Sequence, residues 1–199
     1  MPTGHSEGGA RAHVRGIIPD AENRPDLDFY RTPAIGTRRL LAAERIPGPI
    51  WEPACGDGAI SEVLAEAGLE VASSDLVDRG YGTPGVDFLD RIFDPPFEFR
   101  SIVTNPPYTH VEEFARRGLE LVRPGGKLIM LCRLLWLEGR RRRSFFEKSP
   151  LSRVLVFSGR LNVSRNGEDY GDGGEGGMVA FAWFIWTPGS VGPPTLGWI

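Results

Sequence analysis

Apolar and polar positions follow two different periods along most of this chain. Short apolar runs of strand length alternate with longer stretches in which apolar residues recur every three or four positions, the spacing of a helix with one buried face. The expected helices are 34–45, 59–67, 110–122 and 139–148, and the expected strands are 49–52, 70–74, 101–104, 127–132, 153–157 and 178–186. Residues 85–89 are expected to approach the sheet again. This alternation predicts an α/β domain with a mostly parallel sheet and helices on both faces.

Two segments depart from this pattern. Residues 1–24 mix Gly, His, Arg and Pro without an apolar core segment, which predicts a flexible N-terminal tail before a single catalytic domain over 25–199. Residues 159–177 hold seven glycines and several acids. A connection of this length predicts a flexible loop that is either a lid or binding loop, or disordered.

Composition narrows the class of protein. With 199 residues, 41% hydrophobic and 25% charged, the chain is typical of a soluble globular domain, and its longest apolar stretch is far shorter than the roughly 20 residues of a membrane helix. We therefore expect a cytoplasmic protein with no membrane span, reduced cysteines at 55 and 132, and no metal site. The net charge of −3 offers no overall attraction to phosphate, so nucleic-acid binding would need a local patch.

A glycine-containing loop follows the first strand of the predicted sheet. We call residues 52–58 the glycine loop; its candidate ligand-binding residues are Glu52, Pro53, Ala54, Gly56 and Gly58. The carboxyl end of a strand is where an open α/β sheet holds its ligand, and glycines let a ligand approach the backbone closely. Asp75 lies 19 residues after Gly56 (75 − 56), near the spacing at which an acid reaches a ribose hydroxyl.

The glycine loop also lacks two phosphate-binding features. It has neither a Lys-Ser/Thr pair nor a complete three-glycine dinucleotide fingerprint. S-adenosylmethionine carries a ribose, an adenine and a sulfonium but no phosphate, so it suits an acid-flanked loop of this kind. The alternative is a tight strand-to-helix turn without a ligand.

A second motif follows another predicted strand and reaches the same edge of the sheet. We call it the NPPY motif; it consists of Asn105, Pro106, Pro107 and Tyr108. The prolines hold the turn extended and carry no N–H, so the Asn105 side-chain oxygen and the Pro106 carbonyl are acceptors at close quarters. Two acceptors aimed at the hydrogens of an exocyclic amine favour the pyramidal nitrogen that attacks a methyl sulfonium. Positioning then carries most of the catalysis, and Tyr108 is expected to stack on the planar substrate. The alternative is a strand-ending double-proline turn with a core tyrosine.

The glycine loop and the NPPY motif together resemble the class I amino-methyltransferases. Their order is similar to that of the adenine-N6 DNA methyltransferases of the gamma type and their small phage-like relatives. The resemblance implies a seven-stranded Rossmann-like sheet with an antiparallel last strand and S-adenosylmethionine as cofactor. It also implies cofactor contacts from the segment 29–33 and from the region before the NPPY motif. The residues that it adds to the cofactor set are Thr32, Pro33, Leu76, Asp87, Phe88 and Asn105.

The expected substrate is adenine N6 in a nucleic acid, DNA before RNA. Arg140, Arg141, Arg142 and Arg143 form a candidate phosphate-contact patch, or alternatively a solvated helix face. The same NPPY chemistry serves RNA bases and the amide of a protein glutamine. Gamma-type enzymes usually carry a separate target-recognition domain, whereas only a Gly/Pro-rich segment follows residue 186 here. Two alternatives therefore stay open: a partner that supplies specificity, or a role as the cofactor-binding subunit of a larger enzyme.

Overall fold

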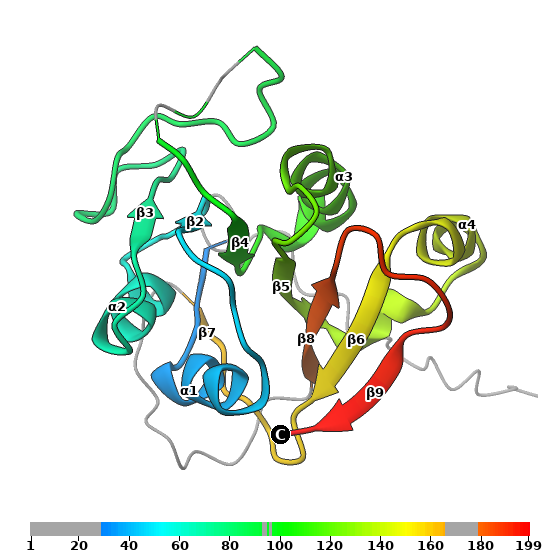
Figure 1. Ribbon diagram of the computed structural model, residues 1–199. Coiled ribbons are helices and arrows are strands. Elements are labelled where there is room, and N and C mark those ends of the chain that lie inside the picture. The colour runs from blue at the N-terminus through cyan, green and yellow to red at the C-terminus, as the bar shows by residue number, and fades with distance from the viewer. Residues whose placement is uncertain (1–28, 93–94, 96, 166–178) are drawn as a thin grey trace, which may run out of the picture.

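A seven-stranded sheet forms the centre of the molecule, seen edge-on in the computed structural model of Figure 1. The structure describes residues 29–92, 95, 97–165 and 179–199. The strand order is β3-β2-β4-β5-β8-β6-β9. Neighbours from β3 to β5 are parallel, whereas β8 runs antiparallel to both β5 and β6. The strands are β2 (Ile50–Glu52), β3 (Val71–Ser73), β4 (Ser101–Thr104), β5 (Leu128–Arg133), β6 (Leu151–Val156), β8 (Phe181–Trp186) and β9 (Thr195–Trp198).

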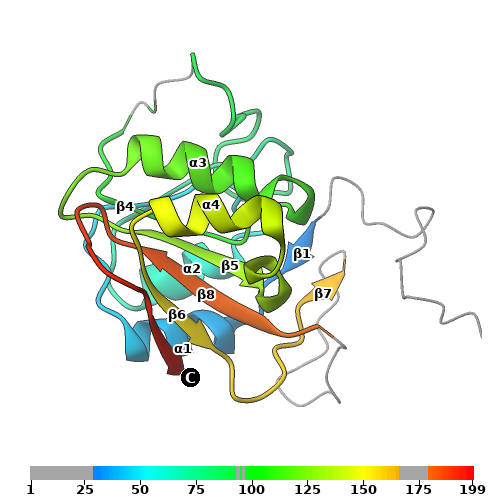
Figure 2. The same cartoon turned by 90° about the vertical axis from the view of Figure 1, so that its right-hand side faces the viewer.

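Helices cover both faces of this sheet. Figure 2 shows α3 (Val111–Leu121) and α4 (Arg140–Lys148) side by side over one face, and α1 (Ala34–Ala43) lies on the opposite side. The second helix of that opposite face is α2 (Ala59–Glu66). The α/β architecture expected from the sequence, with a mostly parallel sheet and an antiparallel strand at 181–186, is thus confirmed.

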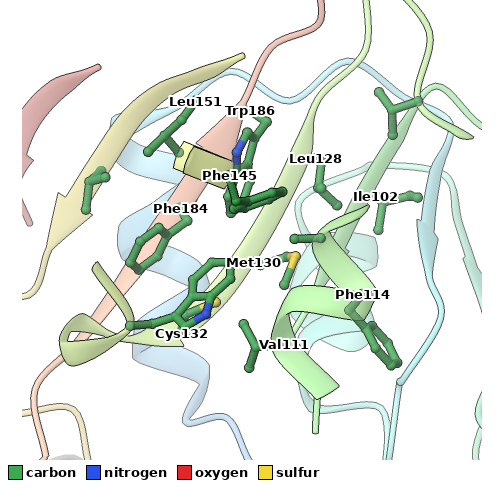
Figure 3. Packing of buried hydrophobic residues seen from close by; sticks show 14 of the residues in the cluster. Ile102, Val111, Phe114, Leu128, Met130, Cys132, Phe145, Leu151, Phe184 and Trp186 are labelled. Atoms are coloured by element: carbon green, nitrogen blue, oxygen red, sulfur yellow. The ribbon is translucent and has the colours of Figure 1, made fainter. Parts of the chain in front are cut away.

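The alternation of side chains along β5 and β8 divides the core in two. Leu128, Met130 and Cys132 of β5 belong to the cluster beneath α3 and α4 (Figure 3), whereas Ile129 and Leu131 belong to the cluster beneath α1 and α2. The side chains of β8 alternate in the same way, because Trp186 lies in the first cluster and Trp183 in the second. β8 is apolar at every position, and β5 is apolar at every position before Arg133, because both faces of these strands are buried.

Three short strands were not predicted. β9 lies after the last expected strand and pairs with β6 at the edge of the sheet. β1 (Tyr30–Arg31) and β7 (Ser164–Arg165) form a separate antiparallel pair, and β7 lies inside the segment expected to be a flexible loop. Residues 1–24 and 166–178 lie outside the described residues, so the predictions made for them remain predictions.

The segment 85–89 approaches the sheet as expected, although it forms no strand. The Val86 backbone N–H donates to the Asp75 carbonyl at 3.0 Å. The Phe88 ring packs edge-on against Trp51 of β2, with ring centroids 5.2 Å apart. Within the described ranges, no helix has the length and apolar character needed to cross a membrane.

Candidate active site

A cavity of about 550 Å³ lies at the carboxyl ends of β2, β3 and β4, and we call it the principal cavity. This volume lies in the range of small-molecule sites. Its lining comes from the glycine loop, from the residues after β3, from the segment 86–89, from the NPPY motif and from the segment 29–32. The predicted residues that line it are Thr32, Glu52, Pro53, Ala54, Asp75, Leu76, Asp87, Phe88, Asn105, Pro106 and Pro107.

The glycines of the glycine loop make room for aromatic rings. Gly56 and Gly58 have positive φ angles of 58° and 89°. A Cβ at Gly56 would lie 2.3 Å from Cε2 of Phe29, and one at Gly58 would lie 2.6 Å from the Tyr81 ring. Neither glycine lines the principal cavity. The Phe29 and Tyr81 rings pack against them instead.

Four carboxylates from the glycine loop and the following segments line the principal cavity: Glu52, Asp57, Asp75 and Asp87. Asp75 accepts the Gly56 N–H at 2.8 Å through Oδ2 and the Val77 N–H at 2.9 Å through Oδ1. It thereby fixes the glycine loop to the end of β3. Acids gathered in a half-enclosed cavity favour a cationic ligand and disfavour a phosphate.

Asp57 forms an ion pair with Arg31, whose Nε lies 2.6 Å from Asp57 Oδ2. The other oxygen, Oδ1, is buried and has no hydrogen-bond partner among the described residues. A buried oxygen of this kind loses hydration without compensation unless a ligand donates to it. Asp57 is therefore a candidate ligand acceptor that the sequence analysis did not select.

Glu52 at the end of β2 is almost fully buried, with 1% of its surface exposed. Its carboxylate accepts a hydrogen bond from the Ser61 hydroxyl of α2. Burial raises the pKa of Glu52 well above its ordinary value of 4.5; the Ser61 bond opposes that rise, and the charges of Asp75 and Asp57 add to it. A cation in the principal cavity would favour the ionised form.

Glu52→Gln is expected to be more stable than the parent at neutral pH, with a smaller dependence of stability on pH. Because the folded-state pKa is raised, the folded parent binds more protons than the unfolded chain above about pH 4.5, and its stability falls as the pH rises toward the folded-state value. Chemical denaturation of both proteins from about pH 4 to about pH 8 measures the difference. A stability difference that stays constant over this range would contradict the raised pKa.

β4 places Asn105 at the edge of the principal cavity, where its side-chain amide is held by the segment before α1. Nδ2 donates to the Tyr30 carbonyl at 2.8 Å and to the Thr32 hydroxyl at 3.0 Å. A backbone carbonyl can only accept, so the nitrogen of the amide must face Tyr30. The oxygen, Oδ1, is left buried without a partner among the described residues. Asn105 therefore lines the principal cavity and carries one acceptor oxygen that no described residue pairs with.

Tyr108 begins the short helix η3 (Tyr108–His110) and does not line the principal cavity. Its ring lies 4.8 Å from that of Tyr30 and 5.8 Å from that of Phe181, and the Arg133 guanidinium lies 4.5 Å from its centroid. Burial raises the pKa of Tyr108, and the Arg133 charge and the Asn105 amide oppose that rise. Tyr108 borders instead a neighbouring cavity of about 490 Å³. Its stacking on a substrate stays a prediction.

The arginines of α4 lie outside the principal cavity. Arg142 donates to the Trp136 carbonyl at 2.9 Å and to the Glu138 carbonyl, and Arg143 pairs with Glu147 at 2.7 Å. Arg140 and Arg141 are exposed. Arg142 and Tyr108 border the same 490 Å³ cavity, so one residue of the arginine patch lies near the NPPY motif.

Pro33 is the remaining predicted cofactor residue outside the lining, where it caps α1. The lining includes residues that no single motif had selected, among them Cys55, Asp57, Val77, Arg79, Thr109, His110 and Phe114. Two signals in the sequence could have found some of them, since Asp57 lies between two glycines and His110 follows the NPPY motif closely. Val77 and Arg79 line the cavity because of the path that the chain takes after β3, which no local sequence pattern predicts.

Comparison with solved structures identifies the fold. No family model and no curated protein matches the chain. A protein from Listeria monocytogenes proposed to be a class I S-adenosylmethionine-dependent methyltransferase is similar, with a TM-score of 0.53 and 15% identity over 84% of this chain and 64% of that protein. This chain has the class I methyltransferase fold.

Two further structures share the methyltransferase fold. One is a proposed RNA methyltransferase from Pyrococcus horikoshii, with a TM-score of 0.56 and 13% identity over 81% of this chain and 88% of that protein. The other is a modification subunit of a proposed type I restriction enzyme from Vibrio vulnificus, with a TM-score of 0.55 and 15% identity. That match covers 87% of this chain and 48% of the subunit, so this chain spans about half of it.

Proposed function

We propose that this chain is an S-adenosylmethionine-dependent N-methyltransferase and that its acceptor is adenine N6 in DNA. The observation that carries the proposal is Oδ1 of Asn105, which has no partner in the described part of the chain, whereas the amide nitrogen is held by two hydrogen bonds. A hydrogen-bond acceptor at this position suits a substrate whose methyl-accepting nitrogen carries N–H groups. The methyltransferase fold and the order of the two motifs support the same reaction class.

The principal cavity fits the proposed cofactor by its charge. S-adenosylmethionine carries a sulfonium and an ammonium, and the acids Glu52, Asp57 and Asp75 surround the glycine loop. One buried oxygen of Asp57 has no partner within the described ranges, and an ammonium group would donate to it. We assign Asp75 and Asp87 to the hydroxyl-bearing and adenine end of the cofactor. When bound, the cofactor supplies an electrophilic methyl group.

The residues of the chain act on the acceptor nitrogen by position. Asn105 Oδ1 accepts one hydrogen of the amine and favours the pyramidal nitrogen. With the cofactor bound, this nitrogen would take the methyl group as the carbon–sulfur bond broke, and the methylated nitrogen would then release a proton to water. No strong base is needed, which agrees with a site whose candidate acceptors are an amide oxygen and a backbone carbonyl. Arg140 and Arg141 on α4 are the proposed contacts to nucleic-acid phosphates.

The direct test is transfer of radiolabelled methyl groups from S-adenosylmethionine to double-stranded DNA, single-stranded DNA, RNA and a protein extract in parallel. Nucleoside analysis of the product should give N6-methyladenine in DNA. Label only in RNA or in protein would keep the reaction class and overturn the DNA assignment. Cofactor binding without transfer to any acceptor would favour a subunit that needs a specificity partner.

Asp75→Ala is expected to weaken binding of S-adenosylmethionine by about tenfold or more, the change that corresponds to roughly 1.4 kcal/mol. The substitution removes the proposed ribose acceptor and releases the Gly56 and Val77 N–H groups that Asp75 holds. Calorimetric titration measures the affinity. Asp90→Ala is the matched control, because Asp90 also accepts a nearby backbone N–H, that of Ile92 at 2.9 Å, but lies outside the principal cavity. Parental affinity in Asp75→Ala would remove its cofactor role.

A further inference from the structure

Thr32 lies between β1 and α1 and contacts the candidate catalytic amide directly. Its side chain is buried, with 2% of its surface exposed. Its hydroxyl accepts the hydrogen bond from Asn105 Nδ2 at 3.0 Å, across 73 positions of sequence. The resemblance placed Thr32 at the cofactor, whereas this contact places its hydroxyl at the Asn105 amide.

The Asn105 amide needs two acceptors to be fully oriented. Its nitrogen carries two hydrogens, and the Tyr30 carbonyl takes one of them at 2.8 Å. With that bond alone, the amide could still rotate about its last side-chain bond, because the Tyr30 carbonyl constrains a single hydrogen. The Thr32 hydroxyl takes the second hydrogen, so the plane of the amide is set, and Oδ1 is the atom for which the described residues offer no partner.

Neighbouring contacts hold the segment that carries Thr32. Tyr30 and Arg31 form β1, which pairs with β7. The Tyr30 ring packs on Tyr108, and Arg31 forms the 2.6 Å ion pair with Asp57 in the glycine loop. The segment is therefore tied at once to the glycine loop and to the NPPY motif, and it gives Thr32 a fixed position.

We infer that Thr32 is a positioning residue whose hydroxyl fixes the side-chain plane of Asn105 and so aims the amide oxygen at the acceptor nitrogen. The inference rests on the proposed function, because it assigns Thr32 a part in the same methyl transfer. It differs from a cofactor-binding role in its consequence. Loss of the hydroxyl lowers kcat and leaves cofactor affinity unchanged.

The first test compares Thr32→Val with Thr32→Ser in the full chain. Valine has nearly the shape of threonine but no acceptor, and we expect it to lower kcat by between about tenfold and a hundredfold, with parental affinity for S-adenosylmethionine. Serine keeps the hydroxyl and is expected to restore most of kcat. Thr37→Val is the matched control, because Thr37 is fully buried in α1 and its hydroxyl has no partner among the described residues. It should keep parental kcat.

The second test does not depend on activity. NMR of isotope-labelled protein follows the two side-chain amide protons of Asn105, and both should exchange slowly with water in the parent. In Thr32→Val the exchange of one proton should become about tenfold faster or more, and Thr32→Ser should restore the protection. Thermal melting shows whether each variant is folded.

The outcomes separate the inference from the function on which it rests. Unchanged amide protection in a folded Thr32→Val protein, or parental kcat in that variant, overturns the positioning role. Weakened cofactor binding with parental kcat would also overturn it, in favour of a cofactor contact. Absence of methyl transfer in the parent, together with faster amide exchange in Thr32→Val, would overturn the proposed function and support the orienting contact.

Discussion

Asn105→Ala is expected to lower kcat for methyl transfer by about two to three orders of magnitude and to leave the affinity for S-adenosylmethionine nearly unchanged. The substitution removes Oδ1, the buried acceptor that has no partner among the described residues. An acceptor whose bond strengthens as the amine becomes pyramidal contributes mainly in the transition state, so its loss appears in kcat rather than in cofactor binding. Single-turnover methyl transfer and calorimetric titration measure the two quantities.

Asn162→Ala makes the same chemical change outside the principal cavity and serves as the control, with parental kcat expected. Thermal melting of both variants is needed, because Asn105→Ala also releases the Tyr30 carbonyl and the Thr32 hydroxyl from their hydrogen bonds. A folded Asn105→Ala protein with parental kcat would remove Asn105 from the catalytic role.

Gly126→Ala is expected to lower the free energy of unfolding by about 3 kcal/mol. A Cβ at Gly126, just before β5, would lie 1.8 Å from the Arg100 carbonyl oxygen and 2.8 Å from the Arg100 carbonyl carbon. These are backbone atoms, and the Arg100 N–H donates to the Pro49 carbonyl at 2.7 Å. Arg100 therefore cannot move without disturbing the pairing of β2 with β4. Chemical denaturation measures the loss.

Gly159→Ala is the matched control for this stability prediction. Nothing lies within 4 Å of a Cβ at Gly159, and its backbone is outside the left-handed region, so we expect stability close to that of the parent. Equal stability of Gly126→Ala and the parent would show that the sheet edge yields more easily than this contact implies. Because β4 carries Asn105, Gly126→Ala should also report on methyl transfer if the edge shifts.

The elements that the sequence predicted are those in which the pattern of apolar residues itself shows which positions are buried. β5 and β8 are apolar at successive positions, and α3 has apolar residues at helical spacing, so each was located to within about three residues at either end. β1, β7 and β9 have only two to four residues and no period of their own. Their hydrogen bonds come from distant partners, which a local pattern does not contain.

The site divides in the same way. The sequence by itself determined the α/β class, the glycine loop and the NPPY motif, because each depends on residues close together in the chain and on the rule that parallel strands end at one edge. Only the tertiary structure decided which atom of Asn105 is free, since the acceptors of its amide lie 75 and 73 positions away at Tyr30 and Thr32. It also decided that the Tyr108 ring packs against Tyr30 and Phe181, because contacts between separate segments form only when the sheet and the segment before α1 are assembled.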